Sequence, residues 1–136
     1  MATGNHISVE NSPFDFRKIK YVGEDINTDD TQLIEARGYD HAFKLKGDKN
    51  QIKLYNEDNG IEMTVSTDMP YTHVYTANYL NGEKGENGRV YKERDAVCLE
   101  TECLPNGMNN GYPDKIILRA GEKYHSSTIF SFSIKI

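Results

Sequence analysis

Short runs in which apolar and polar residues alternate dominate the chain, and this is the pattern of half-buried β-strands. The two clearest runs span residues 51–55 and 61–67. Asp58-Asn59-Gly60 stands between them, and Asn and Gly tolerate the positive φ of a tight turn. These residues predict a β-hairpin. Other runs show the same alternation, at residues 38–45, 72–78, 97–101 and 128–136.

Helical periodicity is almost absent from the sequence. The acidic and polar stretch 25–37 has weak helical spacing and predicts one short helical turn or an ordered loop. Turn residues recur at short intervals, and the sequence contains neither an internal repeat nor a linker. We therefore expect an all-β fold, a β-sandwich of seven to ten short strands, in a single domain that spans residues 1–136.

Two segments supply aromatic side chains for the core. The loop 12–17 carries Phe14 and Phe16, which we expect to pack against the end of a sheet. The last run, 128–136, predicts a strand with four inward-pointing side chains: Phe130, Phe132, Ile134 and Ile136.

Residues 38–45 contain the first candidate polar site. In a strand, Asp40 lies on the face opposite Tyr39 and His41, and the pattern alone favours a solvated carboxylate at Asp40. His41 shares its face with large apolar residues, which favours a packed core imidazole over a catalyst. In the run 72–78, His73 is either a partly exposed strand residue or a polar contact to a ligand.

The run 97–101 places Glu100 near the end of a predicted strand. Val97, Leu99 and Thr101 face one way, so Glu100 faces the other way. A Glu at such a position is usually a solvated surface residue. The loop that follows is rich in Asn, Gly and Pro up to Pro113, and a loop of this length could wall a pocket.

Composition narrows the classes of partner. The net charge of −5 and the pI near 5.3 argue against nucleic acid and against an anionic membrane as partners. No apolar run approaches the length of a membrane span, and the N-terminal residues lack a secretion signal pattern. Cys98 and Cys103 would face opposite sides of one extended strand, so we expect reduced thiols and a cytoplasmic location. We find no set of residues at metal-ligand spacing and expect no metal.

The string C-L-E-T-x-x-x-P-x-x-x-N at residues 98–109, followed by I-L-R-x-G-E-x-Y, resembles the C-terminal end of the aldose 1-epimerases, the galactose mutarotases. Two other strings are similar to that family: G-x-D-H-x-F at residues 38–43, and a strand of the type Q-x-Y-T-x-N in which His73 stands where many members carry Gln. The resemblance runs from about Thr3 to Phe132. It implies the C-terminal part of a β-sandwich of the galactose mutarotase-like supersandwich type.

The resemblance also implies an activity and a site. Members are isomerases that interconvert the α and β anomers of hexoses such as galactose or glucose, without a cofactor. Glu100 takes the position of the catalytic base, and Asp40 and His73 take substrate-binding positions toward a monosaccharide. The alternative is a truncated, non-catalytic carbohydrate-binding or structural β-domain.

The resemblance places two further histidines of the family, an acid and a sugar ligand, in an N-terminal half that this sequence does not contain. We expect either a C-terminal fragment or a shortened relative. Part of a sandwich exposes strand edges and apolar surface. We therefore expect either a homo-oligomer or a missing N-terminal half that covers these surfaces.

Overall fold

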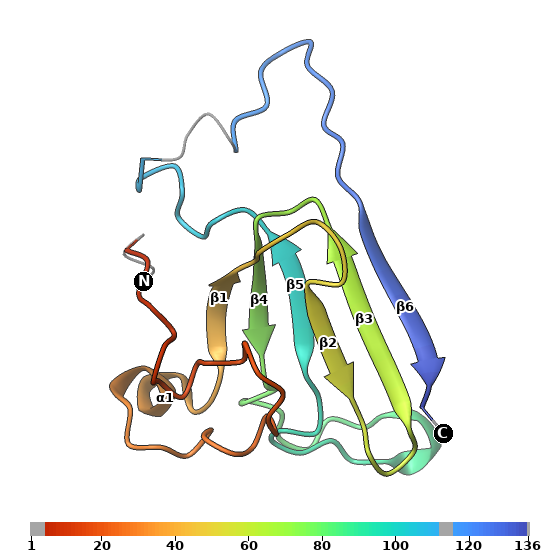
Figure 1. Cartoon of the computed structure of the whole chain (residues 1–136). Helices are drawn as coiled ribbons and strands as arrows, with labels where there is room; N and C mark the ends of the chain where they lie inside the picture. Colours follow the sequence, from red (N-terminus) through yellow and green to blue (C-terminus); the bar gives the residue numbers. More distant parts are fainter. Residues whose placement is uncertain (1–4, 112–115, 136) are drawn as a thin grey trace. The chain divides into compact units, whose positions relative to one another are not determined.

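The structure is a computed structural model that describes residues 5–111 and 116–135. Its elements, in chain order, are α1 (Thr31–Ala36), β1 (Asp40–Lys44), β2 (Ile52–Tyr55), β3 (Ile61–Thr67), β4 (Tyr71–Tyr75), the 3₁₀ turn η1 (Glu86–Gly88), β5 (Cys98–Glu102) and β6 (Thr128–Ile134) (Figure 1). Strands dominate, and the predicted all-β class is confirmed. The described residues form six strands, fewer than the seven to ten that we expected. None of their helices has the length and apolar character that crossing a membrane requires.

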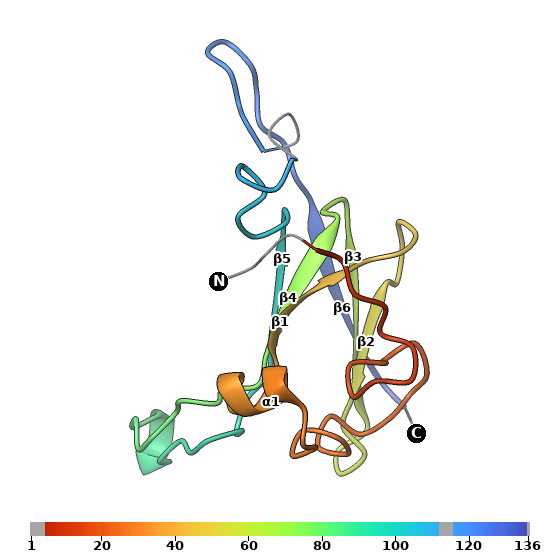
Figure 2. The same cartoon turned by 90° about the vertical axis from the view of Figure 1, so that its left-hand side faces the viewer.

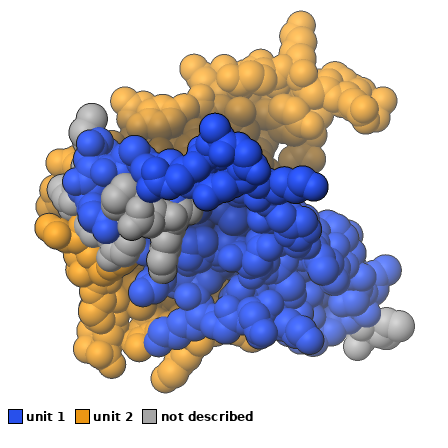
Figure 3. Space-filling model, turned by 90° about the horizontal axis from the view of Figure 1, so that it is seen from above, with its two compact units in different colours: residues 1–4, 42–72, 101–136 blue, residues 5–41, 73–100 orange. Residues whose placement is uncertain are grey.

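The strands form two three-stranded sheets, in the orders β1-β4-β5 and β2-β3-β6, whose labelled strands can also be followed in Figure 2. The chain divides into two compact units, which Figure 3 colours separately. Unit 1 comprises residues 1–4, 42–72 and 101–136, and unit 2 comprises residues 5–41 and 73–100. We describe each unit by itself, and the assignment of residues 1–136 to one domain stays a prediction.

In unit 1, β2 and β3 form the predicted hairpin. The strands are antiparallel, with Ile52 opposite Val65 and Leu54 opposite Met63. The turn between them is closed by Asn56, whose carboxamide oxygen accepts hydrogen bonds from two backbone N–H groups of the turn. Gly60 has a φ of 72°, which a glycine adopts without strain. The hairpin prediction is confirmed. The alternation of apolar and polar residues did not predict the hydrogen bonds of Asn56 that stabilise the turn.

β6 adds to the other side of β3 along its whole length, with Phe130 opposite Val65 and Phe132 opposite Met63. Directly opposed residues share one face of a sheet. This face is therefore apolar across all three strands, and its members are Ile52, Leu54, Ile61, Met63, Val65, Phe130, Phe132 and Ile134. The other face is polar, and Glu62 lies there within 3.3 Å of Lys53 and 3.6 Å of Lys135.

The prediction that the aromatic side chains of the last strand point into a core is wrong. Phe130, Phe132 and Ile134 are 47%, 68% and 71% exposed. The alternation identified their common face correctly, but the burial of that face is concentrated on the central strand, where Val65 is fully buried. The fourth residue of the prediction, Ile136, lies outside the described residues.

Unit 2 is built around Tyr39, whose side chain is fully buried. The rings of Phe14 and Phe16 meet the Tyr39 ring edge-on, with centroids 5.8 Å and 5.1 Å away. The Tyr39 hydroxyl donates a hydrogen bond of 2.8 Å to the carbonyl oxygen of Pro13. Burial, with Asp25 and Glu24 nearby, raises the pKa of Tyr39 to about 12. The predicted packing of the loop 12–17 is confirmed.

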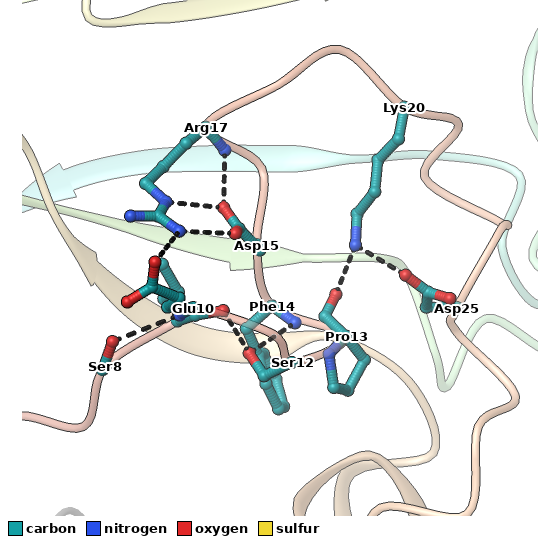
Figure 4. A network of polar contacts seen from close by, with 10 residues as sticks. Ser8, Glu10, Ser12, Pro13, Phe14, Asp15, Arg17, Lys20 and Asp25 are labelled. Carbon is teal, nitrogen blue, oxygen red and sulfur yellow. Dashed lines mark hydrogen bonds and ion pairs between the residues drawn. The ribbon is translucent and has the colours of Figure 1, made fainter.

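Ion pairs also fix the same N-terminal loop, on the side that faces away from the core (Figure 4). The Arg17 guanidinium donates two hydrogen bonds to the Asp15 carboxylate, of 2.8 Å and 2.7 Å. These bonds lower the pKa of Asp15 to about 2. Lys20 donates to the Asp25 carboxylate and to the Pro13 carbonyl, each at 2.7 Å. The loop is therefore fixed at both its aromatic side and its charged side.

The predicted helical turn within residues 25–37 is α1. The carboxylate of Asp30 caps its start, since it accepts hydrogen bonds from the N–H groups of Gln32 and Leu33. Arg37 ends the helix in the left-handed conformation, with a φ of 58°. Leu33 is the buried residue of the helix and anchors it in unit 2.

Candidate functional site

The three residues that the sequence singled out lie on the three strands of one sheet. Asp40 begins β1, His73 is the middle residue of β4, and Glu100 is the middle residue of β5. Since the strand order is β1-β4-β5, His73 belongs to the central strand between the other two. All three residues belong to unit 2.

Asp40 and His73 are in direct contact. The Nε2 atom of His73 lies 2.7 Å from an Oδ1 oxygen of Asp40, the distance of a strong hydrogen bond. The two side chains therefore point to the same face of the sheet. The His73 side chain is 25% exposed and the Asp40 side chain 40% exposed, so both remain accessible to a small ligand.

A buried polar cluster beneath this pair fixes the register of the two strands. The N–H of Tyr39 donates to the Thr76 hydroxyl at 3.1 Å, and the N–H of Thr76 donates to the Tyr39 carbonyl at 3.1 Å. The amide of Asn78 donates to the carbonyls of Tyr39 and Ala36. Thr76 and Asn78 are 2% and 3% exposed. Because Tyr39 directly precedes Asp40, this cluster positions the Asp40 carboxylate.

Gly38 completes the same support. Its φ is 138°, and a Cβ atom at this position would lie 2.5 Å from the Asn78 carboxamide oxygen. A side chain would displace Asn78, so glycine is required here. The sequence reasoning missed this support, although the signal was present: Thr76 and Asn78 are the T and N of the string Y-T-x-N, on a segment that continues past the end of β4.

His41 is a packed imidazole, as predicted. Its Nδ1 atom accepts a hydrogen bond of 2.9 Å from the backbone N–H of Asp40. The Phe14 ring contacts it with centroids 4.8 Å apart. Burial lowers the pKa of His41 below its usual value of 6.5 and so favours the neutral ring. His41 therefore supports Asp40 from the apolar side of β1.

Glu100 is exposed on β5. The next residue, Thr101, turns its hydroxyl to that of Thr128, with 2.7 Å between the two oxygens. Because neighbouring side chains of a strand point to opposite faces, Glu100 and Thr101 point to opposite faces of β5. That Glu100 and Asp40 reach the same ligand stays a prediction.

A separate hollow of about 350 Å³ lies in unit 2, and no residue of the predicted site lines it. It is lined by Val22, Gly23, Ile26, Asn27, Thr76, Arg94, Ala96 and Val97. Arg94, one of these lining residues, donates hydrogen bonds to the Asn27 carboxamide oxygen at 2.9 Å and to the Arg37 carbonyl at 3.1 Å. These contacts tie the segment before β5 to the end of α1. We assign Arg94 a structural role.

Metal-ligating residues do not cluster in the structure. Within residues 5–111 and 116–135, no group of three or more His, Cys, Asp or Glu side chains is placed to hold a metal ion. Cys98 and Cys103 are both half-buried. The candidate site offers two carboxylates and an imidazole, groups that can accept, donate and transfer protons.

Comparison with known proteins identifies the family. A model of the aldose 1-epimerase family matches residues 1–131. The chain is 35% identical to a galactose mutarotase of Homo sapiens over 136 residues, and 34% identical to an aldose 1-epimerase of Escherichia coli over 132 residues. These alignments include 97% and 92% of the chain. The chain belongs to the aldose 1-epimerase family.

Solved structures share the fold. The chain is similar to a galactose 1-epimerase from Lactobacillus acidophilus, with a TM-score of 0.80 and 29% identity over 94% of the chain. It also shares its fold with an aldose epimerase homologue from C. elegans, with a TM-score of 0.77 and 23% identity over 97% of the chain.

The match covers only part of each relative. The chain spans 38% of the length of the human and E. coli relatives, and 37% and 40% of the two solved structures. That this part is the C-terminal one stays a prediction.

Proposed function

We propose that this chain contributes the catalytic base and part of the sugar-binding site of an aldose 1-epimerase, an isomerase that interconverts the α and β anomers of a hexose such as galactose or glucose. Glu100 is the base, and Asp40 and His73 bind sugar hydroxyls. The observation that supports this proposal most strongly is the contact of 2.7 Å between Asp40 and His73. The two residues belong to separate sequence motifs that resemble the family, and the fold brings these motifs together on the adjacent strands β1 and β4.

The reaction requires two coordinated proton transfers. The base removes the proton of the C1 hydroxyl while an acid protonates the ring oxygen, and the bond between C1 and the ring oxygen breaks. Rotation about the C1–C2 bond then presents the other face of the carbonyl. Closure reverses both proton transfers and yields the other anomer, with no net change in atoms or electrons.

Each residue suits its proposed task. Glu100 is an exposed carboxylate on β5, and a carboxylate can act as the general base that accepts a proton. A carboxylate offers about four acceptor sites, so Asp40 holds the His73 imidazole and still accepts a sugar hydroxyl. The imidazole of His73 contributes a donor or an acceptor, as the Gln of other members does through its amide.

The reaction also needs a general acid that protonates the ring oxygen. The resemblance assigns it to a histidine of the family that has no counterpart in this sequence. Among the described residues, His73 is the first candidate, because an imidazole can donate a proton and His73 lies on the strand between β1 and β5. General acid and base assistance typically contributes about a hundred- to ten-thousand-fold in rate. We therefore expect the chain by itself to accelerate the reaction only weakly.

Polarimetry on a freshly dissolved single anomer of galactose tests the proposal. The parent chain should equilibrate the anomers somewhat faster than buffer, and Glu100→Gln should return the rate to that of buffer. Glu93→Gln is the matched control, because it removes an exposed carboxylate of the same unit outside the site, and it should keep the parent rate.

Two results would count against catalysis by Glu100. A parent chain that tracks the buffer blank would favour the alternative, a non-catalytic carbohydrate-binding domain of the same family. A rate that survives Glu100→Gln would show that another group is the base.

A further inference from the structure

His41 supplies a hydrogen bond that the neighbouring strand does not give to Asp40. The N–H of Thr76 donates to the Tyr39 carbonyl at 3.1 Å, so the backbone groups of Tyr39 face the β4 side. This orientation alternates along a strand, and the N–H of Asp40 therefore points away from β4. In the order β1-β4-β5, β1 is an outer strand of the described sheet. The Nδ1 atom of His41 accepts this outward N–H at 2.9 Å.

This contact requires one protonation state of the His41 ring. A backbone N–H can only donate, so Nδ1 must be without a proton, and the neutral ring carries its proton on Nε2. A protonated imidazole carries a hydrogen on both nitrogens and accepts at neither. Protonation of His41 therefore sets two donors against each other and breaks the bond to the Asp40 N–H.

The surroundings of His41 hold its ring in place and favour the neutral form. The Phe14 ring packs against it edge-on, with an angle of 68° between the ring planes. Burial is the main cause that lowers the pKa of His41 below 6.5, and the imidazole of His73 acts in the same direction. The carboxylates of Asp40 on β1 and Asp30 at the start of α1 oppose this shift without reversing it. The ring is therefore neutral at neutral pH.

We propose that His41 is a positioning residue of the sugar site, which fixes the backbone of Asp40 and releases it when the imidazole is protonated. Thr76 and Asn78 hold the preceding residue, Tyr39, and His41 holds Asp40 itself. Neighbouring side chains of a strand point to opposite faces, so His41 acts on Asp40 through the backbone and does not touch the ligand. This inference rests on the proposed function of Asp40 as a sugar ligand.

Nuclear magnetic resonance of the isotope-labelled chain tests the contact without a ligand. As the pH falls below 6.5, the backbone amide signal of Asp40 should shift in step with protonation of the His41 ring. His41→Asn should abolish this step, because the Asn Oδ1 atom is an acceptor at the same distance along the side chain and does not titrate. His73→Gln, which removes the neighbouring imidazole, should keep the step. His125→Asn is the matched control in unit 1 and should also keep it.

Galactose titration tests the positioning role and separates it from the proposed function. His41→Phe keeps a ring against Phe14 but offers no acceptor, and it should bind galactose about 2- to 10-fold more weakly than the parent at neutral pH, the scale of one hydrogen bond. His41→Asn should bind more tightly than His41→Phe, and its affinity should fall less steeply in acid than that of the parent.

Three results would overturn the inference. An Asp40 amide step that survives His41→Asn would show that another group causes it. Parent-like binding by His41→Phe would show that the acceptor does not position the ligand. A parent that binds no galactose while its amide step is present would instead refute the proposed function, and the sugar role of His41 with it.

Discussion

At the scale of single residues, the structure shows how buried polar groups place the proposed sugar ligand Asp40. The Thr76 hydroxyl and the Asn78 amide form hydrogen bonds to the backbone of Tyr39, the residue before Asp40. They therefore position Asp40 through its neighbour in the chain. Buried polar groups of this kind are satisfied by specific partners, and their loss leaves the remaining partners unpaired.

We predict that Thr76→Val destabilises the protein by about 1–3 kcal/mol, because the Tyr39 N–H and the Asn78 oxygen then lose a buried partner. Urea unfolding measures the change. Thr72→Val is the matched control: Thr72 is equally buried, but its hydroxyl has no hydrogen-bond partner among the described residues. This change should be close to neutral. Equal losses for both variants would contradict the assigned role of Thr76.

Sequence patterns could predict the pair of Asp40 and His73 as candidates but not their contact. Both residues occur in sequence motifs that resemble the family. The alternation within one strand, however, does not indicate which strand lies beside it. The role of the supporting residues could not be predicted from these patterns. Thr76 and Asn78 are polar, and a polar residue in a sequence is assigned to the surface unless its partners are known.

At the scale of elements, local turn chemistry could be predicted better than burial. Asn59-Gly60 predicted the hairpin of β2 and β3 because the conformation of a tight turn depends on the residues within it. The inward orientation predicted for Phe130 and Phe132 was wrong, because burial depends on what covers a face. The predicted strand 72–78 ends at Tyr75, and Ala77 has a φ of 51°, outside the extended region.

The connection from α1 to β1 gives a prediction at this scale. Gly38→Ala should destabilise the protein by about 1–3 kcal/mol more than Gly47→Ala. Both glycines have positive φ values, 138° and 76°, but only the methyl group at position 38 would collide with Asn78. Thermal or urea unfolding of the two variants gives the comparison. If the two losses were equal, backbone strain alone would explain the glycine, and Asn78 would not be fixed as described.

At the scale of the whole molecule, the family is established over nearly all of this chain, while the chain spans 38% of its curated relatives. The sequence could predict the family because short strings such as CLET and GYDHAF carry it. It could not predict how deeply each apolar face is buried, because burial depends on what packs against that face in the folded protein. The exposed side chains of β6 are the clearest example.

We propose that Asp40, His73 and Glu100 belong to one monosaccharide site. Titration of the isotope-labelled chain with galactose, followed by nuclear magnetic resonance, tests it most directly, with open-chain galactitol as the control ligand. We predict that galactose shifts the signals of these three residues together. Asp40→Asn should weaken binding about 10- to 100-fold, because a hydrogen bond to a charged group contributes about 1.5–3 kcal/mol. Shifts confined to the hollow around Arg94, or an Asp40→Asn variant with the parent affinity, would contradict the account.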